Sequence, residues 1–144
     1  MVATPFHVLA VEDESADAEF IERVGSQSPL AASFRLLRSA EEARAYLDGD
    51  EPFTDRNQFP VPNLILLDLK LRRMSGLDLL RWIRHNPAFR SMPVVVLSGM
   101  ADANALNRAY ELGIDAYIVK PVDLKGLAAT LSGVLVTLAS QRVG

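Results

Sequence analysis

The stretch "LILLDLKLRRMSG" (residues 64–76) decides the fold, because four branched aliphatic residues run directly into an acid. No polar residue interrupts residues 64–67, so neither face of this segment is marked as solvent-exposed. An unbroken apolar run of this length indicates a strand buried on both faces, as in a parallel sheet covered by helices. Asp68 ends that strand, and its carboxylate needs a polar partner where the chain leaves the apolar core.

Strand and helix patterns alternate along the whole chain. Capping residues mark several helix starts: Ser39 with Glu42 forms a capping-box spacing, and Ser75 precedes a run with helical periodicity. We also expect Asp102 and Asp123 to cap helices, the last one ending near Ser140. Residues 50–62 contain three prolines and predict a long loop. The apolar runs predict strands at residues 6–11, 33–38, 64–67, 94–97 and 115–119.

Five strand–helix units with buried strands predict an α/β fold, an open doubly wound five-stranded parallel sheet with helices on both faces. A closed barrel would require eight such units and more chain than 144 residues. We expect a single domain over residues 1–144 with no output domain.

Composition excludes several classes of protein. The net charge of -3 argues against a nucleic-acid partner, which needs a clustered basic face. We expect the densest basic group to be solvated; it consists of Arg72, Arg73, Arg81 and Arg84. The chain has no cysteine, and its N-terminus has neither a charged n-region nor a long apolar segment. We therefore expect a cytoplasmic protein that neither enters a membrane nor binds nucleic acid.

Polar side chains follow four of the predicted strands. Glu12 and Asp13 follow the first strand, Asp68 the third, Ser98 the fourth and Lys120 the fifth. Each alone is equally consistent with a turn, a cap or a surface position. Ligands of open parallel sheets, however, bind outside the carboxyl ends of the strands, where all five residues should lie.

This combination of residues favours phosphoryl transfer. Three neighbouring carboxylates repel one another, and a hard divalent cation such as Mg²⁺ resolves that repulsion. A metal, a lysine, a hydroxyl and one carboxylate free to attack are the parts of a phosphoryl-transfer site. A carboxylate nucleophile would give an aspartyl phosphate.

Four ordered motifs carry a family resemblance: "VEDES" (11–15), "LLDLKLRRMSG" (66–76), "VVLSG" (95–99) and "YIVKPVD" (117–123). Together they resemble the signature regions of response-regulator receiver domains, the chemotaxis-regulator family, over about residues 6–140. The resemblance implies a sheet of strand order 2-1-3-4-5 and a stand-alone regulator that a sensor histidine kinase phosphorylates.

The resemblance also implies roles for individual residues. Asp68 would be the phosphoacceptor, while Ser98 and Lys120 would contact phosphoryl oxygens. Ser98 and Tyr117, which occupies the aromatic position three residues before the lysine, would form the switch. The Mg²⁺ ligands would be Glu12, Asp13, Asp68 and the backbone carbonyl of Lys70.

A narrower resemblance rests on the Glu–Asp order of the acid pair and on the extended proline-containing loop. Both features are similar to the single-domain regulators that partner bacterial and cyanobacterial phytochromes, which implies a bacteriophytochrome as the kinase. One position departs from the family: Arg72 stands where many members have proline, and we expect a less rigid loop there. The small residue expected at the far end of that loop, Gly76, is present.

Two other functions compete with this interpretation. An aspartyl-phosphate phosphatase of the haloacid type would need a second acid two residues after the nucleophile, and Lys70 stands there. A degenerate receiver, used as a static interaction domain, would usually have lost the acid pair, the acceptor or the lysine. None of these is missing from the sequence.

The output of the regulator is expected to be partner binding or self-association. In the last predicted helix, one apolar stripe should pack on the sheet; it consists of Leu124, Leu127, Leu131, Val134, Leu135 and Leu138. Lys125 is the only charge from residue 124 to residue 141, and Ala129 and Val136 point away from the stripe. A face with so little charge predicts a homodimer through this helix. Lys70 and Met100 flank the site, and we expect them to screen an acyl phosphate from water.

Overall fold

The structure is a computed structural model that describes residues 6–27, 31–99, 103–120 and 123–143. Strands and helices alternate along the chain, as the apolar periodicity predicts. The strands are β1 (Phe6–Val11), β2 (Ala31–Leu37), β3 (Leu64–Asp68), β4 (Val94–Gly99) and β5 (Ala116–Lys120). The helices are α1 (Ser15–Ser26), α2 (Ala40–Asp48), α3 (Gly76–His85), α4 (Ala103–Leu112) and α5 (Leu124–Val143).

The strands form one parallel sheet of order β2-β1-β3-β4-β5, which confirms the predicted fold class and strand order. β3 is the central strand, and all five of its residues are buried. Leu66, for example, pairs with Ala10 of β1 on one side and with Val95 of β4 on the other. An apolar run without alternation is what a strand covered on both faces requires.

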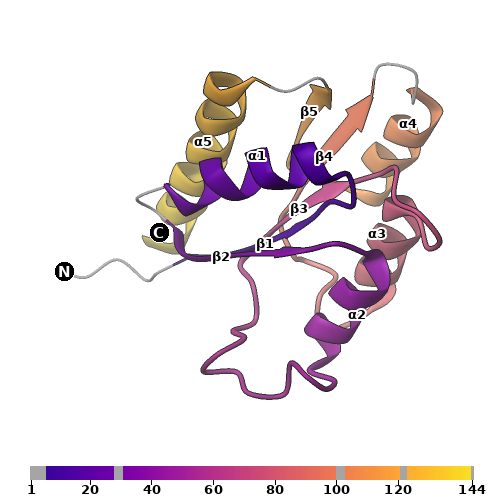
Figure 1. Cartoon of the computed structure of the whole chain (residues 1–144), viewed down its shortest axis with the longest axis vertical. Coiled ribbons are helices and arrows are strands. Elements are labelled where there is room, and N and C mark those ends of the chain that lie inside the picture. Colours follow the sequence, from indigo (N-terminus) through magenta and orange to yellow (C-terminus); the bar gives the residue numbers. More distant parts are fainter. Residues whose placement is uncertain (1–5, 28–30, 100–102, 121–122, 144) are drawn as a thin grey trace.

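Helices cover both faces of the sheet. Figure 1 shows α1 and α5 together on one side, and α2, α3 and α4 on the other. Each layer has its own apolar core: Leu66, Leu97 and Leu131 belong to the α1/α5 side, whereas Leu67, Leu80 and Val96 belong to the other. Alternate residues of one strand therefore enter opposite cores, as the pleat requires. The carboxyl ends of all five strands consequently lie at one edge of the molecule.

β5 differs from the expectation that every strand is buried. It pairs only with β4, at the edge of the sheet, and alternate side chains along it are exposed. Tyr117 is 43% exposed, and its ring packs edge to face against Tyr110 of α4 at a centroid distance of 5.7 Å. A sequence run of apolar and aromatic residues does not distinguish an edge strand from a central one.

The helix starts follow the capping residues. Ser39 accepts a hydrogen bond from the Glu42 amide, and Ser75 accepts one from the Asp78 amide, as predicted. Asp123 accepts one from the Gly126 amide at the start of α5. Asp102, the cap expected for α4, lies outside the described residues. α5 continues to Val143, a few residues beyond its expected end near Ser140.

Arg84 is not the solvated side chain that the sequence suggested. Its half-buried guanidinium donates to the carbonyls of Met92 at 2.8 Å, of Gly113 at 2.7 Å and of Leu112 at 3.1 Å. Leu112 is the last residue of α4, and Met92 and Gly113 lie in the connections before β4 and β5, so one guanidinium with several N–H donors bonds carbonyls of two separate segments. This side chain therefore fastens α3 to the loops before β4 and β5.

The predicted loop at residues 50–62 is ordered by its own small cluster. Phe53 and Phe59 pack against Tyr46 of α2, with ring centroids 5.1 and 6.0 Å from it. Arg56 closes the end of α2 by donating to the carbonyls of Tyr46 and Leu47, both at 2.9 Å. No helix among the described residues is long and apolar enough to cross a bilayer.

Candidate functional site

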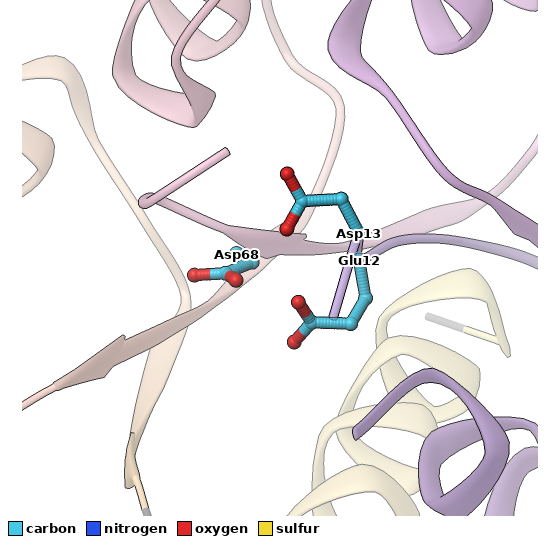
Figure 2. A group of neighbouring side chains, drawn as sticks. All are labelled: Glu12, Asp13 and Asp68. Atoms are coloured by element: carbon cyan, nitrogen blue, oxygen red, sulfur yellow. The ribbon is translucent and has the colours of Figure 1, made fainter. Parts of the chain in front are cut away.

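Three carboxylates meet where β1 and β3 end. Glu12 and Asp13 follow β1 directly, and Asp68 is the last residue of β3. Figure 2 shows the three side chains gathered at the carboxyl end of the sheet. One oxygen from each lies within 4.8 Å of the others, although Glu12 and Asp68 are almost fully buried. The sequence prediction that the strand ends bring these acids together is confirmed.

Lys120 supplies the positive charge of this group. Its Nζ lies 2.6 Å from Glu12 Oε1 and 3.0 Å from Asp68 Oδ2. It also lies 3.0 Å from Asp17 Oδ2 on the first turn of α1. The Lys120 side chain is 21% exposed, so this cation is mostly withdrawn from water. One ammonium group thus links the ends of β1, β3 and β5 with α1.

Burial and charged neighbours shift the pKa values of Glu12 and Lys120. The pKa of Glu12 rises from 4.5 to about 7; burial is the main cause, and Asp68 contributes to the rise. Lys120 lowers the pKa of Glu12 but does not cancel the increase. Burial opposes the charge on Lys120, yet hydrogen bonds to Glu12 and Asp68 raise its pKa above the ordinary lysine value. The lysine therefore stays protonated, whereas burial and the neighbouring Asp68 favour the protonated form of Glu12.

Asp68 is fixed through both of its oxygens. Oδ1 accepts the Lys70 amide at 3.0 Å, and Oδ2 faces Lys120 Nζ. The following loop returns close to Asp68, and the Gly76 amide donates to the Leu69 carbonyl at 3.0 Å. A Cβ at Gly76 would collide with the Asp68 carbonyl oxygen. The small residue expected there is thus required by the close approach of the two backbones.

Asp13 is held from two directions. Its Oδ2 accepts the backbone amide of Arg72, in the loop after β3, at 2.7 Å. Its backbone carbonyl accepts Arg38 Nη2 at 3.0 Å, and the same guanidinium nitrogen lies 3.1 Å from Ser15 Oγ. The loop around Arg72, expected to be less rigid, is therefore tied to the acid loop across 59 positions of sequence.

The other predicted site residues lie at the same edge. Ser98, near the end of β4, is 2% exposed, and its hydroxyl donates to the Gly99 carbonyl at 3.3 Å. The Lys70 side chain is exposed, so only its backbone approaches Asp68. Tyr117 lies on β5, three residues before Lys120, with its side chain largely outward. Met100 lies outside the described residues.

Two groups that contact the site residues do not follow a strand, so the strand-end pattern does not identify them. They are the Asp17 carboxylate and the backbone amide of Arg72. Asp17 does not follow a strand; it belongs to the first turn of α1, four positions after Asp13. The available signal is its position on the first helical turn after the acid pair, where acidic side chains are common. The Arg72 amide gives no such signal, since every residue except proline carries a backbone donor.

The donors present fit a divalent cation. Three carboxylate oxygens, close together and partly withdrawn from water, are the hard ligands that Mg²⁺, Mn²⁺ and Ca²⁺ prefer. Burial is the main cause of the raised pKa of Glu12, and a cation beside this carboxylate would favour its ionised form. The acid pair, the buried aspartate and the lysine are all in place, so nothing here favours a degenerate site.

Comparisons with known proteins agree with this site and fold. The response regulator receiver domain family matches residues 8–132. Response regulator Rcp1 of Synechocystis sp. is 33% identical over 130 residues, which cover 90% of this chain and 86% of Rcp1. The phosphorylated cyanobacterial phytochrome response regulator RcpA has a TM-score of 0.78 at 30% identity, over 91% of each chain. The Mn²⁺-bound form of Rcp1 has a TM-score of 0.76 at 33% identity, over 90% of this chain and 91% of Rcp1.

Proposed function

The chain belongs to the response regulator receiver domain family, and from that premise we propose that Asp68 accepts a phosphoryl group from a sensor histidine kinase. As a two-component response regulator it is a signalling protein and not a member of a classical enzyme family. The observation that carries the proposal is the position of Asp68, a buried carboxylate 3.0 Å from Lys120 Nζ and grouped with Glu12 and Asp13.

In this reaction an oxygen of Asp68 attacks the phosphorus of a phosphohistidine. The new P–O bond forms as the P–N bond breaks, and the departing imidazole keeps the electron pair and takes up a proton. Lys120, already paired with Asp68, is placed to neutralise a phosphoryl oxygen. Ser98, buried near the end of the neighbouring strand, offers a hydroxyl donor for another. The protein thereby promotes its own phosphorylation.

Glu12, Asp13, Asp68 and the backbone carbonyl of Lys70 are the residues that would hold the cation, which we propose is Mg²⁺. When bound, Mg²⁺ neutralises charge on the transferring phosphoryl group. Glu12 and Asp13 are adjacent in sequence and follow the same strand, so β1 positions half of these ligands together. The rigid sheet thus fixes the acids relative to the nucleophile.

More specifically, we propose that the partner kinase is a phytochrome histidine kinase. Support comes from the relatives, since RcpA is a cyanobacterial phytochrome response regulator and others are bacteriophytochrome response regulators. The Glu–Asp order of the acid pair and the long proline-containing loop at residues 50–62 support the same partner. Output would then come from partner binding or self-association.

We propose two consequences of phosphorylation. A phosphoryl group brings a charge of about −1.5 to −2, which attracts the Ser98 hydroxyl and leaves space for Tyr117 to turn inward. Tyr117 is positioned for this, because its ring now lies outward against Tyr110. The second consequence concerns a homodimer through α5, whose outer residues Ala129 and Val136 are both exposed. Leu127, Leu131 and Leu135 of the opposite stripe are buried.

Phosphotransfer from a purified, autophosphorylated phytochrome histidine kinase tests the function. The wild type should take up label when Mg²⁺ is present and lose that ability in excess chelator. Asp13→Asn should remove Mg²⁺-dependent labelling while leaving Asp68 in place. Full labelling of Asp13→Asn would exclude Asp13 from the metal site, and labelling that ignores the chelator would exclude a metal-dependent reaction.

A further inference from the structure

Asp13 is held by donors other than the lysine that pairs with Glu12 and Asp68. Its Oδ2 accepts the Arg72 amide at 2.7 Å, a length typical of a hydrogen bond to an ionised acceptor. The backbone carbonyl of the same residue accepts Arg38 Nη2 at 3.0 Å. Both the side chain and the main chain of Asp13 are therefore fixed by donors that lie outside the acid group.

We infer that Arg72, through its backbone amide, and Arg38, through its guanidinium, are positioning residues that hold Asp13 in the orientation used for metal binding. This inference rests on the metal site of the proposed function. A carboxylate that accepts one hydrogen bond still has free lone pairs for a cation. Because Asp13 is already ordered, less conformational entropy is lost when the cation binds.

The amide of Arg72 also offsets charge. Asp13 lies close to Glu12 and Asp68, and the repulsion among the three favours turning Asp13 outward to water. Lys120 is paired with Glu12, Asp17 and Asp68, and no ion pair among the described residues joins it to Asp13. The hydrogen bond from Arg72 keeps Asp13 near the other two acids without adding a cation that would compete with the metal.

The loop conformation supports this role. Arg73, the next residue, has a φ of 60°, which is uncommon for a residue with a side chain. Such a conformation persists where surrounding contacts determine the backbone. The hydrogen bond between the Arg72 amide and Asp13 is one of these contacts, and it joins the loop after β3 to the loop after β1. The turn at Arg73 and the orientation of Asp13 thus depend on each other.

Proline at position 72 provides the direct test, because it removes the N–H donor. Arg72→Ala removes the charged side chain but keeps the amide, so it separates the two contributions. Arg72→Pro should raise the Mg²⁺ dissociation constant, measured by titration calorimetry, about tenfold, the lower end for loss of an outer-shell partner. Arg72→Ala should stay within about twofold of wild type.

A second readout separates positioning from a general loss of structure. With acetyl phosphate as donor, Arg72→Pro should need more Mg²⁺ for half-maximal phosphorylation but reach the wild-type rate at saturation. Near-ultraviolet circular dichroism checks the fold. An unchanged dissociation constant in Arg72→Pro overturns the inference, and so does an equal increase in Arg72→Pro and Arg72→Ala, which would assign the effect to the side chain.

Arg38→Met keeps the test decisive if Arg72→Pro does not fold. Loss of this exposed donor should raise the Mg²⁺ dissociation constant about two- to fivefold, and no change in that variant overturns the inference. Asp13→Asn distinguishes failure of the inference from failure of the proposed function. If Asp13→Asn binds Mg²⁺ as the wild type does, the metal site itself is wrong. If it does not bind Mg²⁺ while the Arg72 and Arg38 variants do so normally, only the positioning role fails.

Discussion

Replacement of Lys120 by methionine isolates the charge that holds the site together. The substitution keeps most of the apolar stem but leaves Glu12, Asp68 and Asp17 without their shared cation. Removing one partner of a fully buried ion pair costs about 3–5 kcal/mol. Lys120 is partly exposed and Glu12 can take up a proton, so we expect a loss of about 2–3 kcal/mol in metal-free protein near pH 8.

The pKa of Glu12 determines how the free energy of unfolding changes with pH. In the metal-free wild type the pKa of Glu12 rises from 4.5 to about 7 on folding, so the native state binds more protons than the unfolded state between these values. The free energy of unfolding therefore falls as pH rises through this window. Lys120 lowers the pKa of Glu12, so Lys120→Met raises that pKa further and extends the fall to higher pH. The difference between variant and wild type should therefore be larger near pH 8 than near pH 5, where the lost pairs with Asp68 and Asp17 still contribute.

Urea unfolding, followed by the fluorescence of Trp82 and by circular dichroism, measures these free energies. Lys70→Met is the matched control, since the Lys70 side chain is exposed and its loss should change the free energy of unfolding by less than about 0.5 kcal/mol. Saturating Mg²⁺ should restore part of the stability lost in Lys120→Met, because the cation replaces the missing positive charge. Unchanged stability near pH 8, or an equal loss at both pH values, would refute the role assigned to Lys120.

Three further predictions concern the switch, the lifetime and the assembly. The Tyr117 ring should turn inward in a crystal structure with a bound phosphoryl mimic, and an unchanged ring would separate this residue from the switch. Met100→Ala and Lys70→Ala should each speed the loss of the phosphoryl group, measured after removal of the donor. If both variants lose it at the wild-type rate, these side chains do not screen it from water. The double substitution Ala129→Glu and Val136→Glu should give a folded monomer by light scattering. A wild type that is monomeric at tens of micromolar, with and without the phosphoryl mimic, would rule out the α5 dimer.

The unbroken apolar pattern of residues 64–67 predicted a covered parallel sheet, because such a short run is typical of a strand buried on both faces. Grouping of the acids and the lysine followed from topology, since parallel strands end at the same edge. The exposure of alternate β5 side chains could not be predicted from the sequence. β5 is an edge strand because of its place in the sheet, which its composition does not indicate. The half-buried position of Arg84 did not follow for a related reason: the carbonyls that it satisfies include those of Leu112 and Gly113, 28 and 29 positions away.

Contacts made by backbone groups were the least predictable part of the site. The Arg72 amide and the Asp13 carboxylate are 59 positions apart, and the sequence letter at position 72 indicates only that a donor exists. The absence of proline there could be noted, but its consequence depended on where the loop places the amide. Asp17 is easier to predict than the Arg72 amide, because it lies on the first turn of the helix that directly follows the acid pair.

The central claim is that Asp68 is the phosphoacceptor, and intact-protein mass spectrometry after incubation with acetyl phosphate and Mg²⁺ tests it most directly. Asp78→Asn is the matched control, because Asp78 is an exposed aspartate on α3. We predict that the wild type and Asp78→Asn each gain the mass of one phosphoryl group, and that Asp68→Asn folds normally and gains none. A phosphoryl group retained by folded Asp68→Asn would contradict the account.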